Sequence, residues 1–208
     1  MTRTARHALA LIFLLLAALP TAAPAAHAAD SASATVERLN AALLEVMQQA
    51  ETLGYAGRYD RLAPDLKQIF DFPTMARIAL GGHWSSISSA QQEAFTQAFT
   101  GYSIGVFANR FNGYGGEIFE VLGEQPARRG TVLVRNRIVK GDGEAIAIDY
   151  LAKPEAEGEG WRIIDTILGG TASELAARRG EYNSIIEKSG IVALIESLKD
   201  KTAAYANQ

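Results

Sequence analysis

Residues 131–153 read TVLVRNRIVKGDGEAIAIDYLAK, two runs rich in valine and isoleucine on either side of Gly141-Asp142-Gly143. Apolar and polar side chains alternate along each run, which is the period of a β-strand with one buried face. A short link of Gly and Asp is typical of a hairpin turn. This stretch decides the fold, because it predicts two adjacent antiparallel strands at 131–140 and 144–153.

The segments 118–123 and 161–168 alternate in the same way and predict two further strands. Outside this region, apolar residues recur every three or four positions, which predicts helices on both sides of the strands. Helices, then consecutive strands, then helices predict one α+β domain, with helices packed on one face of a curved four-stranded antiparallel sheet. The predicted helices lie at 31–53, 65–70, 73–80, 88–111, 173–188 and 191–204, and residues 55–64 are predicted to be a turn-rich connector.

Two helix starts carry a capping signature, a Ser or Thr followed three residues later by Gln or Glu. Ser88 with Gln91 predicts the start of the long helix, and Thr171 with Glu174 predicts the start of the helices that close the chain.

The composition excludes several classes of protein. The chain has 208 residues, no cysteine, three histidines, 20 basic and 23 acidic side chains. It therefore offers no disulfide framework, Cys-ligated metal or cysteine nucleophile. Its negative net charge argues against long-range attraction to nucleic acid.

The N-terminus has the order of a secretory signal peptide. Arg3 and Arg6 precede an apolar run from Ala8 to Leu19, and Ala26-His27-Ala28 provides an A-x-A cleavage site. The apolar run is too short for a membrane-spanning helix, which needs about 20 residues. We therefore expect a cleaved signal peptide at 1–28, a periplasmic location and a single mature domain at 29–208.

Three features resemble catalytic motifs. Gly101-Tyr102-Ser103-Ile104-Gly105 matches the G-x-S-x-G nucleophile elbow, but it lies within a helical period and no histidine follows it. His83 has no second histidine or cysteine beside it to complete a metal site. Asp149 and Asp165 are candidates for an acid/base pair, although a buried carboxylate is more often bonded to an arginine or to backbone N–H groups. No catalytic residue and no metal or cofactor site is predicted.

The stretch IFDFPTMARIALGGHW at 69–84 resembles the signature of the MlaC/toluene-tolerance family of periplasmic lipid-binding proteins. Asp149-Tyr150, Trp161 with Asp165, and Arg179-Gly-Glu-Tyr182 extend the resemblance over nearly all of the mature chain. Within the family, the sequence is similar to the hopanoid-associated branch called HpnM. It departs from the family at Ile164, where a tyrosine is usual, at Gly169, where a glutamate is usual, and at Phe107, where a tyrosine is usual. These departures leave room for a less polar lipid.

The resemblance implies a carrier, not an enzyme, that binds a phospholipid or a hopanoid in an apolar cavity between sheet and helices. It also implies two partners, an MCE-domain ABC transporter in the inner membrane and a lipoprotein–porin complex in the outer membrane. A ligand-free periplasmic adaptor and a small-ligand enzyme on a related scaffold are the alternatives.

Periodicity cannot distinguish a cavity wall from an ordinary core, so the wall residues are a hypothesis. From the helices and their ends we expect Phe72, Met75, Leu80, Trp84, Phe95, Phe99, Tyr102, Gly105, Val106 and Phe107. From the strands we expect Val132, Val134, Ile138, Ile146, Ile148, Tyr150, Trp161, Ile163 and Ile167.

Two further expectations concern single residues. Asp165 is expected to pair with Arg77 or Arg179 and to tie the sheet to the helices. Gly101 and Gly105 share one helix face, where their missing side chains leave space for a closely packed helix or for a ligand. We favour the ligand.

Overall fold

The computed structural model describes residues 31–156 and 160–207, so the expected signal peptide at 1–28 lies outside the described residues. The described residues form five α-helices and one antiparallel sheet with the strand order β1-β2-β3-β4-β5. The helices are α1 (Ala32–Gln48), α2 (Ala50–Ile69), α3 (Phe72–Leu80), α4 (Ser89–Arg110) and α5 (Glu174–Ala206). The strands are β1 (Ile118–Pro126), β2 (Val132–Val139), β3 (Ala145–Pro154), β4 (Trp161–Leu168) and β5 (Ala172–Ser173).

The α+β class and the antiparallel hairpin are as predicted, but the sheet has one strand more than expected. In the central hairpin Val134 of β2 pairs with Tyr150 of β3. The fifth strand, β5, pairs only two residues with the end of β4. Two residues are too few to show an alternating pattern, so the sequence carried no signal for it.

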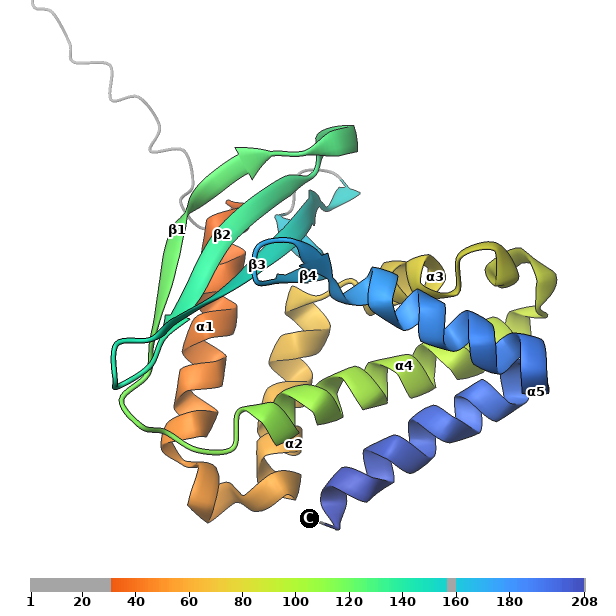
Figure 1. The fold of residues 1–208 in the computed structure, drawn as a ribbon, viewed down its shortest axis with the longest axis horizontal. Coiled ribbons are helices and arrows are strands. Elements are labelled where there is room, and N and C mark those ends of the chain that lie inside the picture. Colours follow the sequence, from red (N-terminus) through yellow and green to blue (C-terminus); the bar gives the residue numbers. More distant parts are fainter. Residues whose placement is uncertain (1–30, 157–159, 208) are drawn as a thin grey trace, which may run out of the picture.

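The core lies between the sheet and the helices that cover one of its faces (Figure 1). Val36, Leu39 and Leu43 stand at helical spacing on α1, and all three are fully buried. Val134 and Tyr150 supply the facing side of the sheet and are equally inaccessible. Below the sheet, α4 runs beside α2 and α5, and α5 folds back on itself (Figure 1).

A β-bulge in β4 changes which of its side chains face the helices. Asp165 pairs with Leu151, but Ala152 pairs with Ile163, so Ile164 is the extra residue. The residues of β4 that follow the bulge therefore point to the opposite face from the one that simple alternation predicts.

The expected connector at 55–64 is wrong, because these residues belong to α2. The helical path does break at Gly54, whose φ of 58° is open to glycine at little cost. Beyond it, Arg58, Leu62 and Leu66 are buried at steps of four. Packing of this face outweighs the low helix propensity of Gly57 and Pro64.

The capping box at Ser88 is confirmed, since its side chain accepts from the N–H of Gln91 and the Gln91 side chain accepts from the N–H of Ser88. The second capping box is wrong. Thr171 lies in a turn after β4, and Ser173 caps α5 by accepting from the N–H of Ala176. The two closing helices are one element with a break at Gly190, where φ is 82°.

No helix within the described ranges is long and apolar enough to cross a membrane.

Candidate functional site

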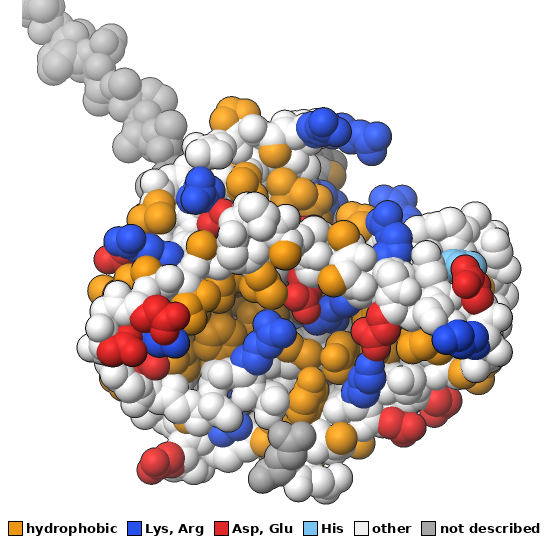
Figure 2. All heavy atoms as spheres, viewed as in Figure 1, with side chains coloured by type: hydrophobic (Ala, Val, Ile, Leu, Met, Phe, Trp, Pro, Cys, Tyr) orange, Lys and Arg blue, Asp and Glu red, His pale blue; other side chains and the backbone are white. Residues whose placement is uncertain are grey.

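A cleft opens between the end of the sheet and helices α3, α4 and α5. Figure 2 shows it as a hollow with an apolar interior, bordered by a few charged side chains. The lining consists of Phe70, Phe72, Met75, Ser103, Val106, Phe107, Arg110, Phe111, Ile148, Tyr150, Thr166, Leu168, Glu174, Leu175 and Arg178.

Aromatic rings in mutual contact form much of this lining. The Phe70 ring stacks on Phe72 with 5.5 Å between centroids, lies 5.4 Å from Phe107, and meets Tyr150 edge-on at 6.5 Å. Phe107 in turn stacks on Phe111 at 5.9 Å. A surface of this kind contacts hydrocarbon through dispersion and excludes water.

Phe70 is held in place by backbone pairing. It forms a parallel bridge with Ile163 of β4, and the N–H of Asp71 donates to the carbonyl of Ile163 at 2.9 Å. Asp71 then caps α3 by accepting from the N–H of Thr74, and it forms an ion pair with Lys153 at 2.6 Å. The segment that links α2 to α3 is thus fixed to the edge of the sheet, with its aromatic side chains in the cleft.

The charged groups of the lining belong to α4 and α5. Arg178 donates to the Ser103 hydroxyl at 3.3 Å and to Glu174 at 3.4 Å, and its guanidinium lies 5.1 Å from the centroid of Tyr102. Burial opposes its charge, but the neighbouring Tyr182 and Glu174 raise the pKa of Arg178 above the ordinary arginine value. The cleft therefore contains a guanidinium that stays charged.

Comparison with known proteins connects this geometry to a family. The family model described as MlaC protein matches residues 37–200. The chain belongs to the MlaC family. A solved structure of the phospholipid-binding protein from Ralstonia solanacearum, in complex with a phospholipid, has the same fold. Its TM-score is 0.73 at 21% identity, over 85% of this chain and 99% of that one. No curated protein matches the chain.

Proteins of the MlaC family are in general periplasmic. The structure brings together six of the residues expected to form a cavity wall in this family member. Phe72, Met75, Val106, Phe107, Ile148 and Tyr150 line the cleft. Their contact with a lipid stays a prediction.

The other expected wall residues lie elsewhere. Leu80, Phe95, Phe99, Val134, Ile138 and Ile163 are buried in the core outside the cleft lining, and Trp84, Tyr102, Val132 and Trp161 pack against that core. Ile146 is 38% exposed near the hairpin turn. Periodicity identified these residues as apolar and facing inward, but it could not separate the core from the cleft.

Because of the bulge in β4, one residue predicted to line the cavity faces away from the cleft, and two residues that were not predicted face it. Thr166 pairs with Tyr150, and Leu168 pairs with Ile148, so these two side chains reach the cleft. Ile167 pairs with Asp149 on the opposite face of the sheet. The expectation that Ile167 lines the cavity with Ile163 is wrong, because the extra residue shifts the alternation.

Gly105 does not line the cleft either. A Cβ atom there would lie 2.9 Å from the Tyr55 hydroxyl oxygen, 3.4 Å from Tyr205 and 3.5 Å from Thr202. The side chains of α2 and α5 therefore fill the space beside this glycine. The favoured expectation of a ligand groove is wrong, and close helix packing is the reason for the glycine.

Asp165 does not form the expected ion pair with Arg77 or Arg179. Its carboxylate accepts from the hydroxyl of Ser173 at 2.6 Å and from the N–H groups of Thr166 and Leu175. Arg179 instead donates to the carbonyl of Ile78. Burial raises the pKa of Asp165, although its hydrogen bonds oppose the shift.

The arginine partner expected for a buried carboxylate is found at Asp149. Arg135 contacts it at 2.9 Å, and the N–H of Asn136 donates to it at 3.0 Å. Asp149 and Asp165 are thus each held by separate structural contacts. Ser103 is also structural: it is buried within α4, so the G-x-S-x-G match has no strand before its serine and is not a nucleophile elbow.

The charged part of the lining, which comprises Arg110, Glu174 and Arg178, was not predicted from the sequence. Phe70 and Phe111 carried a signal, since both belong to the segment 70–119, which is rich in aromatic residues. Nothing in the local sequence distinguishes Arg178 from the adjacent Arg179, because only the packing of α5 decides which of them faces the cleft.

Proposed function

We propose that this protein is a periplasmic lipid carrier that binds a phospholipid in the cleft and shuttles it between inner- and outer-membrane complexes. The observation that carries the proposal is the cleft lined by aromatic side chains in a chain of the MlaC family. The Ralstonia solanacearum protein of the same fold is a phospholipid-binding protein, which supports this ligand class.

The physical need for such a carrier follows from the hydrophobic effect. Two acyl chains of about 15 methylenes each cost roughly 24 kcal/mol to expose to water, at ~0.8 kcal/mol per methylene. Unaided transfer between membranes is therefore slow. A cleft with aromatic and aliphatic walls replaces the bilayer interior during transit and lowers this cost.

The proposal also covers how the protein reaches the periplasm and with which membrane complexes it exchanges lipid. We propose that residues 1–28 are a signal peptide, that 29–208 form the lipid-binding domain, and that the protein exchanges lipid with an MCE-domain ABC transporter and an outer-membrane lipoprotein–porin complex. Binding and release at these complexes need no covalent chemistry, so the proposed function is not that of an enzyme. In the described ranges, no group of three or more His, Cys, Asp or Glu side chains could hold a metal ion.

A hopanoid is the second candidate ligand. Phe107, which stands where a tyrosine is usual in the family, lies in the cleft and makes that wall apolar. Ile164 is buried and Gly169 is exposed, and neither is part of the lining. Only one of the departures from the family thus favours a less polar ligand.

The function is tested by native mass spectrometry of protein purified from the periplasm, followed by lipid extraction. A co-purified phospholipid or hopanoid supports the carrier. A protein that stays empty under gentle conditions, and takes up no lipid from vesicles, would instead support a ligand-free adaptor.

A matched pair of variants on β3 connects lipid content to the cleft. Ile148 lines the cleft, whereas Ile146 on the same strand is 38% exposed and lies outside the lining. We expect Ile148→Glu to lose bound lipid and Ile146→Glu to keep it, because a buried unpaired carboxylate disfavours an acyl chain. Circular dichroism of both variants shows whether the fold is retained. A folded Ile148→Glu protein with unchanged lipid content would contradict the assignment.

A further inference from the structure

The cleft carries a positive charge within an acidic protein. Its lining contains two arginines and one glutamate, a formal excess of one positive charge, whereas the whole chain has a net charge of −3. The remaining lining residues are apolar, apart from the hydroxyls of Ser103, Tyr150 and Thr166. Arg178 is mostly buried and forms an ion pair with Glu174, whereas Arg110 is exposed, so the excess positive charge lies at the mouth, where an anionic group of a ligand can reach it.

Arg178 is stabilised by its neighbours Tyr182 and Glu174, but the two hydrogen bonds that it donates to Ser103 and Glu174 are long. Its side chain is 12% exposed, and its bonds to Ser103 and Glu174 measure 3.3 and 3.4 Å. Both are longer than a good charge-assisted bond, which measures about 2.7–2.9 Å. Phe99 and Tyr102 hold the guanidinium plane at centroid distances of 5.6 and 5.1 Å, which fixes its position from the side. The group is thus held in place and keeps capacity for a stronger acceptor.

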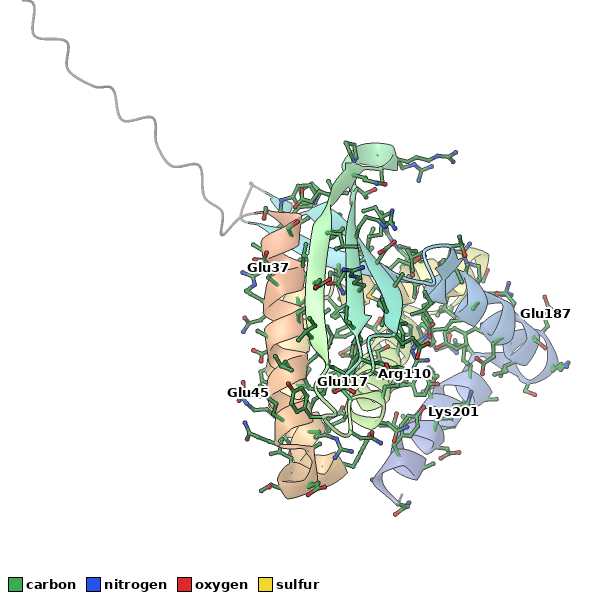
Figure 3. The ribbon with its side chains drawn as sticks, turned by 60° about the vertical axis from the view of Figure 1, so that its left-hand side comes forward. Glu37, Glu45, Arg110, Glu117, Glu187 and Lys201 are labelled. Atoms are coloured by element: carbon green, nitrogen blue, oxygen red, sulfur yellow. The ribbon has the colours of Figure 1, made fainter. Side chains whose placement is uncertain are left out.

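Arg110 provides a second positive charge at the same mouth. It lies in the last turn of α4, and Figure 3 places it between the end of the sheet and α5. Within the described part of the chain, no carboxylate lies within 4.0 Å of its guanidinium. The other basic residue labelled on this side, Lys201, is already paired with Glu181.

We propose that Arg110 and Arg178 form an anion subsite that holds a phosphate monoanion of the ligand at the mouth of the cleft, while its hydrocarbon covers the aromatic lining. This inference rests on the proposed lipid-carrier function and specifies its ligand class. A phosphodiester carries one negative charge and matches the one unbalanced positive charge. A neutral amphiphile that bears only hydroxyls would cover two guanidinium groups and leave that charge uncompensated.

The test compares two ligands with the same acyl chains, one with a phosphoglycerol headgroup and one without it. Vesicles of digalactosyldiacylglycerol, a lipid without phosphate, carry a trace of either pyrene-labelled phosphatidylglycerol or pyrene-labelled diacylglycerol with the same chains, and uptake by the protein is followed by pyrene fluorescence. We expect the parent protein to take up the phosphatidylglycerol more tightly. Arg110→Gln should weaken this binding by about 10- to 100-fold, as expected for loss of hydrogen bonds to a charged group, and leave the diacylglycerol unchanged.

Two controls accompany the variant. Arg128→Gln makes the same change of charge in the short turn between β1 and β2, outside the cleft lining, and should alter neither ligand. Arg178→Gln should act as Arg110→Gln does, and a thermal melt shows whether its loss of packing against Phe99 and Tyr102 unfolds the protein. Arg110 is the decisive site, because it makes no such contacts in the core.

Equal uptake of both lipids by the parent protein, or an equal loss of both in Arg110→Gln, would overturn the inference and leave the carrier function standing. Uptake of neither lipid would refute the carrier function itself. Inorganic phosphate distinguishes the source of the anion. If phosphate alone stabilises the parent protein but not Arg110→Gln, while both lipids bind equally, the arginines bind free phosphate and the headgroup assignment is wrong.

Discussion

Gly101 and Gly105 lie one turn apart on α4 and provide a sharp test of how the helices pack. A Cβ at Gly101 would have one neighbour within 4 Å, the Tyr59 hydroxyl oxygen at 3.6 Å. A Cβ at Gly105 would lie 2.9 Å from the Tyr55 hydroxyl oxygen. The two positions thus share a helix and an amino acid and differ in the space around them.

The expected effects follow from two opposing contributions. Replacing glycine with alanine inside a helix stabilises by about 0.5–1 kcal/mol. At Gly101 this gain is unopposed, so Gly101→Ala should raise the Tm by about 1–4 °C for a domain of this size. At Gly105 the new methyl group overpacks the interface, which typically costs about 1–3 kcal/mol. Gly105→Ala should therefore melt at or below the parent, and Gly105→Leu lower still.

A double variant identifies the responsible atom. The Tyr55 hydroxyl is buried without a hydrogen-bond partner among the described residues, so Tyr55→Phe should itself cost little. It removes the oxygen that lies 2.9 Å from the new Cβ, and Gly105→Ala combined with Tyr55→Phe should recover most of the loss. Thermal and urea unfolding followed by circular dichroism measure all the variants. The reasoning is refuted if Gly105→Ala stabilises as much as Gly101→Ala, or if Tyr55→Phe gives no recovery.

Three further predictions concern buried polar groups. Asp165→Asn should be as stable as the parent near neutral pH or more so, because burial raises the pKa of Asp165 and disfavours its charge. This advantage should shrink as the pH falls through the raised pKa and should be gone once the pH is below the ordinary aspartate pKa. Asp165→Ala should lose about 1–3 kcal/mol with its hydrogen bonds. Arg58 is buried and donates hydrogen bonds to the carbonyls of Ala108 and Ala50. Arg58→Met should therefore lower the free energy of unfolding, measured by urea titration, by about 1.5–3 kcal/mol. An unchanged urea midpoint would contradict this role of Arg58. Burial raises the pKa of Tyr182 to about 12, so its contribution to stability is lost as the pH rises from about 10 through 12, and Tyr182→Phe should unfold at a higher pH than the parent in an alkaline titration.

The parts of the fold that were predictable are those determined by local sequence. The hairpin at 131–153 combines alternation with a Gly-Asp-Gly turn, and its register in the structure pairs Val139 with Ala145 across that turn. The capping box at Ser88 needs only residues three apart. In both cases the interacting groups are close in the chain, so the pattern alone specifies the structure.

The parts that were not predictable depend on contacts between distant residues. Residues 55–64 contain Gly57 and Pro64 and favour a turn locally, but Arg58 reaches the Ala108 carbonyl across 50 residues and holds this segment helical. The lining of the cleft was only partly predictable for the same reason. Phe95 and Phe107 belong to one aromatic stripe of α4, yet Phe95 packs against Tyr182 and Phe107 lies in the cleft.

The bulge in β4 shows how a local feature of one strand and contacts between distant residues act together at the cleft. It turns Thr166 and Leu168 toward the helices and places Asp165 where its carboxylate bonds both Ser173 and the N–H of Leu175. Ser173 is the N-cap of α5, so the same carboxylate determines where that helix begins. The start of α5 in turn sets the positions of Glu174 and, one turn later, Arg178. The start of α5 at the sheet and the packing of that helix thus together place Arg178 in the cleft, and neither is visible in the local sequence. This explains why the sequence pattern could locate the apolar walls but not the charged side chains among them.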